Sequence, residues 1–364
     1  MAEVKNKEHL QEIVKSMPIF KSLGKRSHIM WDVPGRQLSQ EIKSRPVEFA
    51  NNEIHRVLDA KSAYAYKDDD QAYIADIVAP FSPVKALHGE TPAFATRTFY
   101  DRPETAAGKD TPPNLISNVS TMQDYDLTGR ALAIYMSNVD RDNAMQTWGS
   151  VAAWRNILVL LLASLLRLDR EMVVADIYQT TANFGGGSAT ASPLWSEATA
   201  TILGDTATGE DAILAPKDLL VCAHNVFRSL QTNSAITGAT TVSGSRRREL
   251  TPYVNQEAIE NYFDCKMAVG HARYNSASET DTPVFTRVWA DYVSVVHIGS
   301  GGPLATPFAK TYKLQSQAFP NSEGWSVKSV MDSSTMAGGE VVMVGYFVQE
   351  AVFASMSGYS IKGL

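Results

Sequence analysis

The sequence has few of the residues from which most catalytic or metal centres are built. It contains two cysteines in 364 residues, Cys222 and Cys265, and their spacing matches neither a metal site nor a redox motif. Its seven histidines include no HExxH motif and no convincing ligand spacing with a carboxylate. We therefore interpret both cysteines as structural thiols in a reducing compartment, and we expect no metal and no cofactor.

The motifs of nucleotide binding and nucleophilic catalysis are also missing. Glycines 185–187 follow a predicted helix instead of a strand, and no lysine comes directly after them, which argues against a phosphate-binding loop. Ser300 fails the GxSxG pattern because Ile298 occupies the first glycine position. Cys222 and His224 allow a catalytic couple, but a buried thiol beside a partly exposed histidine is the simpler interpretation. We predict that the protein is not an enzyme.

The overall charge gives no case for nucleic-acid binding by the whole chain. The formal net charge is −6, with 20% charged and 44% hydrophobic residues, which is typical of an ordinary globular protein. The first 50 residues carry nine Lys and Arg against six Asp and Glu, a net +3, so the remainder is −9. This asymmetry would suit an N-terminal segment close to a polyanion, although a solvated tail explains it as well.

No stretch is long enough to cross a bilayer. The uncharged run of residues 156–166 is well short of the roughly 20 apolar residues that a spanning helix needs. Residues 1–16 have the pattern of a charged amphipathic helix, not the apolar core of a signal peptide. We expect the protein to remain in the cytoplasm of the cell that makes it, with no membrane partner.

A leucine-rich segment, residues 142–180, dominates the chain. Its centre is free of Pro and Gly, and its apolar residues recur at helical spacing on more than one face, which predicts a long buried helix. Asp140 or Asp142 would cap its start, and glycines 185–187 would end it. By itself the segment fits the core helix of any large globular domain. The positions expected in its core are Trp148, Leu158, Leu161, Leu162 and Leu165.

Residues 79–129 predict a long hairpin, with strand-like pieces at 93–100 and 120–127 around a polar tip. An isolated hairpin is marginal in water. An excursion of about fifty residues also far exceeds the usual loop of about 4–6. We therefore interpret it as an interaction element instead of a functionless surface insertion. Its candidate contacts with a neighbouring subunit are Phe94, Phe99, Tyr100, Met122 and Tyr125.

The rest of the chain separates into an arm, an α/β unit and a closing strand. Residues 1–50 lose their periodicity after a short helix, which indicates an extended arm, and residues 73–78 predict a strand. After residue 216 short elements alternate, and residues 340–354 predict one long β-branched strand. The alternating elements are strands at 219–222 and 266–269, helices at 223–230 and 257–263, and a largely extended segment at 284–298.

This order of arm, hairpin, long helix, glycine run, α/β unit and returning strand resembles the major capsid proteins of tailed phages with the Hong Kong 97-type fold. The resemblance extends from about Tyr73 to the end of the chain and includes no invariant motif. It is carried by residues 166–184 (LRLDREMVVADIYQTTANF), 216–233 (PKDLLVCAHNVFRSLQTN), 265–282 (CKMAVGHARYNSASETDT), 289–299 and 340–363.

The resemblance implies an α+β fold with the parts of that family. These would be an N-terminal arm (1–50), the first part of a P-domain (51–78), an E-loop (79–130), the P-domain with its spine helix (131–200), an A-domain (201–335), a P-domain return strand (336–354) and an end beside the A-domain (355–364). No Lys–Asn pair for crosslinking is identified, and because the segment before the hairpin is short we expect no cleaved scaffolding extension.

The implied function is that of a shell protein. Copies would form hexamers and pentamers that close into an icosahedral head around double-stranded DNA, as part of the virion, after assembly in the host cytoplasm. Portal, scaffold or decoration proteins would be further partners. Two alternatives stay open: an encapsulin-like compartment that encloses protein cargo, and an α/β ligand-binding or enzymatic domain after residue 201 on an oligomeric scaffold.

Overall fold

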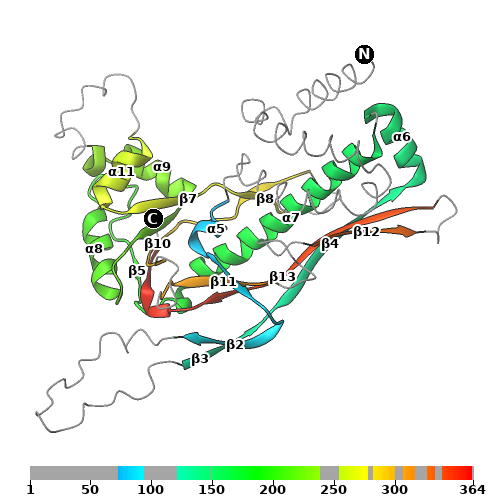
Figure 1. Ribbon diagram of the computed structural model, residues 1–364. Helices are drawn as coiled ribbons and strands as arrows, with labels where there is room; N and C mark the ends of the chain where they lie inside the picture. Colours follow the sequence, from blue (N-terminus) through cyan, green and yellow to red (C-terminus); the bar gives the residue numbers. More distant parts are fainter. Residues whose placement is uncertain are drawn as a thin grey trace, which may run out of the picture.

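In the computed structural model, the described part of the chain forms two five-stranded sheets connected by one long helix (Figure 1). The expected arm and the side chains of Phe94, Phe99, Tyr100 and Trp148 lie outside the described part of the chain. The described residues are 73–93, 121–148, 150–237, 254–277, 282–299, 306–315, 326–332 and 338–362.

The long helix is α7, Val151–Gln179, and it is preceded by a separate helix α6, Asn138–Trp148. The single helix expected from residue 142 is therefore two helices, because the backbone at Ser150 is extended (φ −161°). Asp140 takes part in capping α6: it accepts hydrogen bonds from the N–H and hydroxyl of Ser137, and Ser137 accepts one from the N–H of Asp140. The glycine run does not end α7, which stops at Gln179.

The first sheet, which we call the body sheet, is built around the long return strand β13, Gly339–Val352. On one side β13 pairs antiparallel with β4, Thr128–Ser137. On the other it pairs with β12, Ser326–Asp332, and with β11, Ala309–Leu314, which in turn pairs parallel with β1, Phe81–Val84. This confirms the predicted return strand. Alternate β13 side chains face α7 and form its core with Val159, Leu162, Ala163 and Leu166.

The second sheet, which we call the end sheet, confirms the α/β unit predicted after residue 216. Its order is β5 (Ser188–Thr190), β14 (Gly358–Lys362), β10 (Tyr292–Val296), β6 (Leu219–Ala223) and β7 (Lys266–Gly270). The helices α8 (Ile202–Ala212), α9 (His224–Thr232) and α11 (Gln256–Phe263) pack on it. The expected strand at 284–298 is two strands, because a turn at buried Trp289 separates β9 (Phe285–Arg287) from β10.

Two small antiparallel ribbons complete the described fold. The predicted hairpin is confirmed where the structure describes it: β2 (His88–Ala93) pairs with β3 (Thr121–Asp126) and leaves the body below β13 in Figure 1. The strand that enters the hairpin begins earlier than the expected residue 93. The other ribbon joins β8 (Arg273–Asn275) to β9 beside the end sheet.

Several local expectations were wrong. Residues 73–78 were expected as a strand but contain the short helix α5, Ala75–Val78. The strands β11 and β12 lie in the range expected for the A-domain, yet they pair with β13 in the body sheet. In β11, Lys313 is buried over the rings of Phe81 and Tyr346.

The core positions expected on α7 are only partly correct. Leu158 and Leu162 are 6% and 4% exposed, whereas Leu161 and Leu165 are 43% and 45% exposed and do not belong to the core. The body sheet covers one side of α7. Successive residues of a helix point about 100° apart, so Leu161 points away from the sheet that buries Leu162. The outer side of the helix is therefore apolar but uncovered within the described chain.

Among the described residues, α7 is the one helix that is long and apolar enough to span a membrane by length and composition. It contains three buried charged residues, Arg155, Arg170 and Glu171. Their partners lie on other elements of the same chain, as described below, which is the arrangement of a core helix in a folded domain.

Candidate assembly surfaces

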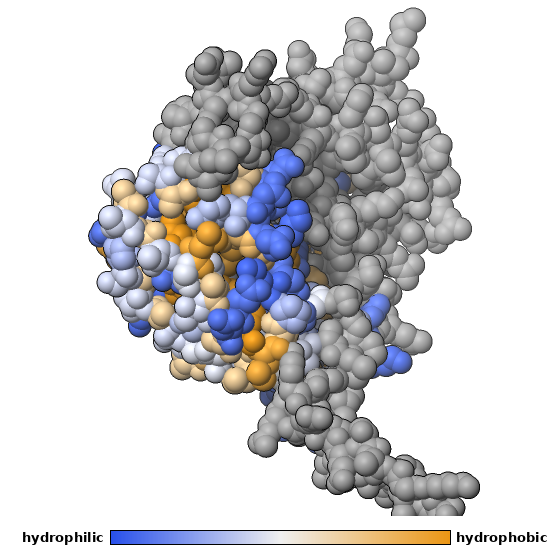
Figure 2. All heavy atoms as spheres, turned by 90° about the vertical axis from the view of Figure 1, so that its left-hand side faces the viewer, coloured by the Kyte–Doolittle hydropathy of each residue, from blue (hydrophilic) through white to orange (hydrophobic). Residues whose placement is uncertain are grey.

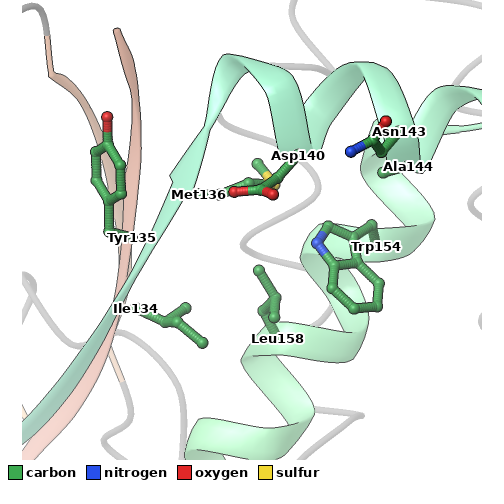
Figure 3. Close-up of a pocket in the computed structure, with 8 residues that line it drawn as sticks. All are labelled: Ile134, Tyr135, Met136, Asp140, Asn143, Ala144, Trp154 and Leu158. Atoms are coloured by element: carbon green, nitrogen blue, oxygen red, sulfur yellow. The ribbon is translucent and has the colours of Figure 1, made fainter. Parts of the chain in front are cut away.

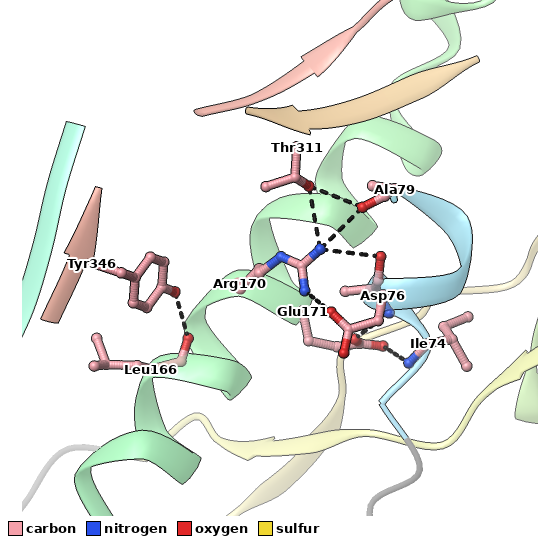
Figure 4. A network of polar contacts seen from close by, with 9 residues as sticks. Ile74, Asp76, Ala79, Leu166, Arg170, Glu171, Thr311 and Tyr346 are labelled. Carbon is pink, nitrogen blue, oxygen red and sulfur yellow. Dashed lines mark hydrogen bonds and ion pairs between the residues drawn. The ribbon is translucent and has the colours of Figure 1, made fainter. Parts of the chain in front are cut away.

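A buried polar cluster connects α7 to α5 and to the body sheet (Figure 4), and a further hydrogen bond connects it to Trp289 before β10. The carboxylate of Glu171 is fully buried and accepts hydrogen bonds from the backbone N–H groups of Ile74 (3.2 Å) and Ala75 (2.8 Å). It also accepts one from the indole of Trp289 at 2.7 Å. Burial raises the pKa of Glu171, although these hydrogen bonds and Arg170 oppose the rise. A single side chain thus caps α5 and holds the turn before β10.

Arg170, the next residue on α7, connects the helix to the body sheet. Its guanidinium forms an ion pair with Asp76 and donates hydrogen bonds to the carbonyl of Ala79 (3.0 Å) and the hydroxyl of Thr311 (3.2 Å). It also lies over the ring of Phe81, 4.0 Å from the centroid. Because buried charges are tolerated only when they are paired, this cluster fixes one relative position of α5, α7 and β11.

Further contacts fix the return strand to α7 along its length. Arg155 and Glu340 form a buried ion pair at 2.5 Å near the beginning of the helix. The hydroxyl of Tyr346 donates to the carbonyl of Leu166 at 3.1 Å. Toward the other end of β13, Arg130 of β4 binds both Glu350 of β13 and Asp169 of α7, each at 2.9 Å. The body sheet and its helix therefore form a stiff unit.

The root of the hairpin packs onto this unit. Tyr125 of β3 is 8% exposed and stacks on Tyr312 of β11, with ring centroids 5.5 Å apart. Gly89 of β2 allows this contact, because a Cβ there would lie 2.7 Å from the Tyr125 hydroxyl. The hydroxyls of Thr91 and Tyr312 are hydrogen-bonded at 3.2 Å. Tyr125 is therefore a core residue of its own subunit, which corrects its expected role as an inter-subunit contact.

Met122 lies on the same hairpin, and its position differs from that of Tyr125. It is 63% exposed and points away from the buried root of the hairpin. With Phe94, Phe99 and Tyr100, which lie outside the described residues, it stays a predicted contact with a neighbouring subunit.

A second uncovered apolar surface follows α7. Leu161, Leu165 and Met172 are each about 40% exposed on the outer side of the helix, and a spacing of four and seven residues keeps them on one face. Beside the start of α7, β4 exposes Leu132 and Tyr135. Among the described strands β4 pairs with β13 alone, so its other edge is free to receive a strand.

A cavity of about 220 Å³ opens between β4, α6 and α7 (Figure 3). Its wall is mostly apolar, with the carboxylate of Asp140 and the amide of Asn143 at one side. The lining residues are Ile134, Tyr135, Met136, Asp140, Asn143, Ala144, Trp154 and Leu158.

The described residues hold no group of three or more His, Cys, Asp or Glu side chains placed to bind a metal ion. Cys222 is buried, and its burial raises the pKa of the thiol to about 12, so it carries no thiolate at neutral pH. The nearby His224 packs on His271 with ring centroids 4.5 Å apart. Sequence reasoning did not find that pair, because residues 224 and 271 meet only through the pairing of β6 with β7.

No family model and no curated protein matches the sequence. Among solved structures, a phage-related protein from Bordetella bronchiseptica superposes with a TM-score of 0.61 at 16% identity, over 83% of this chain and 95% of that chain. The capsid of cyanophage P-SCSP1u gives 0.49 at 11% identity, over 78% and 86%. The SrpI encapsulin from Synechococcus elongatus gives 0.46 at 10%, over 80% and 87%.

The likeness is one of fold. The chain has the fold of the Bordetella phage-related protein over most of its length. The α+β arrangement predicted from the resemblance to the Hong Kong 97-type fold is confirmed in the described chain: hairpin, long helix, return strand, α/β unit and terminal strand are all present.

Proposed function

We propose that this chain is the major capsid protein of a tailed phage, a structural subunit without enzymatic activity. Copies form hexamers and pentamers that close into an icosahedral head. The observation that carries the proposal is the contrast between a stiff body, in which α7 is bonded to both sheets, and apolar surfaces that the subunit leaves uncovered. Those surfaces are the outer side of α7, the edge of β4 and, on the hairpin, the exposed side chain of Met122.

The physical logic of a shell supports this assignment. A closed shell repeats the same contacts by rotation, so each subunit needs complementary surfaces and a fixed shape. Exposed apolar side chains grouped on one helix face and one strand are typical of surfaces that become buried on association. The fold shared with the Bordetella phage-related protein is consistent with such a subunit.

The enclosed partner in this proposal is double-stranded DNA. Residues 1–50, with their net charge of +3, would face the interior and contact phosphates without sequence preference and with strong salt dependence. Portal, scaffold or decoration proteins would attach to the assembled shell. The protein would then be found in the virion, after assembly in the cytoplasm of the host cell.

An encapsulin-like compartment would use the same subunit contacts and differ in what it encloses. Nuclease-protected DNA in purified native particles supports the phage head, and protein cargo supports the compartment. The alternative of a ligand-binding domain after residue 201 gains no support from the cavity, which lies between β4, α6 and α7.

Sedimentation velocity of the purified full-length protein tests self-assembly. We expect a rapidly sedimenting population, far larger than a single ring of subunits, that grows with protein concentration. A protein that remains a monomer or a small oligomer at all concentrations and salt conditions would contradict the proposal.

A further inference from the structure

Two neighbouring parallel strands bring a pair of histidines to one edge of the end sheet. Ala223 at the end of β6 is paired with Gly270 at the end of β7, so His224 and His271 follow at the same edge. Their rings lie 4.5 Å apart. Both histidines directly follow the carboxyl ends of their strands. In open sheets, binding sites commonly form at the carboxyl ends of the strands.

Arginines surround this pair. In the β8–β9 ribbon Arg273 lies directly opposite Arg287, so two arginines are cross-strand neighbours. Arg228 follows His224 by four residues on α9 and so projects from the same face of that helix. Within the described chain, the carboxylate that acts on Arg287 is that of Asp291, which accepts a hydrogen bond from Asn225 at 3.4 Å.

The arginines contribute to lowering the pKa values of both histidines. Burial, and then Arg287, His271, Arg228 and Arg273, lower the pKa of His224 to about 4. Burial and Arg287 likewise lower the pKa of His271. The Nδ1 atom of His224 is buried and has no hydrogen-bond partner among the described residues. These groups concentrate positive charge at this end of the sheet, and positive charge favours contact with a carboxylate.

The same ribbon offers an apolar anchor beside the charge. Phe285 and Arg287 are two residues apart on β9 and therefore share a face, and their cross-strand partners Asn275 and Arg273 share it too. Phe285 is 68% exposed. Arginine next to an exposed aromatic ring is the composition of protein interfaces, whereas phosphate contacts need charge alone. We call Arg228, Arg273, Phe285 and Arg287 the basic face.

The strands toward the other edge of the end sheet carry a helix with the complementary chemistry. Helix α8 packs on β14 and β10, and it turns Leu203, Glu210 and Asp211 outward at a spacing of seven and eight residues. Leu203 is 47% exposed, and Glu210 is bound by Lys217 at 2.6 Å. We call these three residues the acidic face.

The two faces lie toward opposite edges of the end sheet. The sheet order places α8 near the β5–β14 side, while the β8–β9 ribbon follows β7 at the other edge (Figure 1). At the end of the molecule that carries α8, hydrophobic areas adjoin hydrophilic side chains (Figure 2).

We propose that the basic face of one copy binds the acidic face of a second copy, head to tail. This inference rests on the proposed self-assembly and adds the surfaces that perform it. A contact between two different faces of identical chains closes into a ring when the rotation between copies allows it. A second copy is favoured over DNA because the chain itself carries a carboxylate face with an apolar anchor, the counterpart of three arginines and Phe285.

Charge reversal of both faces tests this pairing. The variants are Arg273→Glu/Arg287→Glu, Glu210→Lys/Asp211→Lys, and the combination of all four substitutions. We expect each double variant to reduce the assembled fraction in sedimentation velocity by about tenfold or more, since like charges facing each other in an interface cost several kcal/mol. The combined variant, in which the charges are complementary again, should recover to within about twofold of wild type.

Thermal unfolding of each variant shows whether the subunit is folded. The matched control is Lys85→Glu/Lys328→Glu, which changes the charge by the same amount at exposed positions between β1 and β2 and on β12. Double variants that assemble like wild type, or a combined variant no better than the poorer double variant, would overturn the inference.

Crosslinking separates this inference from the proposed function. In Asp211→Cys/Phe285→Cys, a flexible bismaleimide should link copies into a ladder of dimers, trimers and longer products, while each single variant gives no ladder. A ladder without shells supports the head-to-tail contact and contradicts the capsid proposal. Shells without a ladder, combined with insensitivity to charge reversal, contradict the head-to-tail contact and leave the capsid proposal standing.

Discussion

The carboxylate of Glu171 on the long helix accepts a 2.7 Å hydrogen bond from the indole of Trp289, at the turn that leads into the end sheet. The same carboxylate caps α5, and the neighbouring Arg170 is bonded to Asp76 and Thr311. Body sheet and end sheet therefore meet at one buried polar cluster. In a shell, where a small change of angle is repeated in every subunit, such a fixed junction would keep the curvature uniform.

Replacing Glu171 should weaken the subunit as a whole. In Glu171→Gln the amide retains one acceptor oxygen and turns its NH₂ toward buried N–H groups, and each buried group left unsatisfied costs about 1–3 kcal/mol. We expect the free energy of unfolding, measured with urea, to fall by about that amount or more. Glu257→Gln, at an exposed position of α11, is the matched control and should change it little. Equal effects of the two variants would contradict the role of the cluster.

Leu161 and Leu162 are neighbours in sequence and have opposite environments. Leu162→Asp should prevent stable folding, because it removes a buried leucine that contributes about 1.5–3 kcal/mol and introduces an unpaired charge. Leu161→Asp should change the free energy of unfolding by no more than about 0.5 kcal/mol, as is usual at exposed positions, and should reduce assembly if the outer side of α7 is a contact.

Circular dichroism with urea titration measures the stability of both leucine variants, and sedimentation measures their assembly. Two variants that are equally destabilised would show that the outer side of α7 is covered within the subunit. A Leu161→Asp variant that is stable and still assembles would show that this side is not a contact.

Shortening the hairpin separates folding from assembly. Thr91 and Gln123 are cross-strand partners, so Asn-Gly in place of residues 92–122 would close a two-residue turn and keep the root with Tyr125. We expect a folded subunit of nearly unchanged melting temperature, since loop length alters chain entropy only modestly, and no closed shells. A variant that unfolds would show that the hairpin belongs to the core, and one that closes normal shells would show that the hairpin is not needed for assembly.

Protonation of His224 should contribute to acid sensitivity. Its pKa is about 4 in the folded chain against an ordinary 6.5, so the unfolded state binds the proton more tightly. The stability that this group contributes is fully present above pH 6.5 and is lost as the pH falls toward 4. Asp218 raises the pKa of His297, so the stability that His297 contributes is fully present below pH 6.5. His297 is the same in wild type and in His224→Asn, so it does not affect the difference between the two. His224→Asn should therefore lose less stability than wild type between pH 7 and pH 4, as measured by urea midpoints. An identical pH profile would contradict the shifted pKa.

Local patterns in the sequence predicted the elements that carry their own signal. The alternation of β13 and the sequence of β6, α9, α11 and β7 were predicted within a few residues. Helix α5 was missed because the carboxylate that caps it lies 97 residues away in the sequence. No local propensity contains that information.

The assembly surfaces were harder to predict for the same reason. A helix that is apolar on several sides does not show which leucines face the sheet, so Leu161 and Leu165 were assigned to the core. Tyr125 was assigned to the interface because its partner Tyr312 is far away in sequence. The basic face depends on the pairing of β6 with β7 and of β8 with β9, which only the fold reveals.

Electron microscopy of the purified full-length protein tests the central claim most directly. We predict closed or partly closed hollow particles, tens of nanometres across, in which rings of six and five copies are resolved and the hairpin of one copy lies on the next. A uniform population of small oligomers without curved sheets, under conditions in which the subunit is folded, would contradict the assignment of this chain as a shell protein.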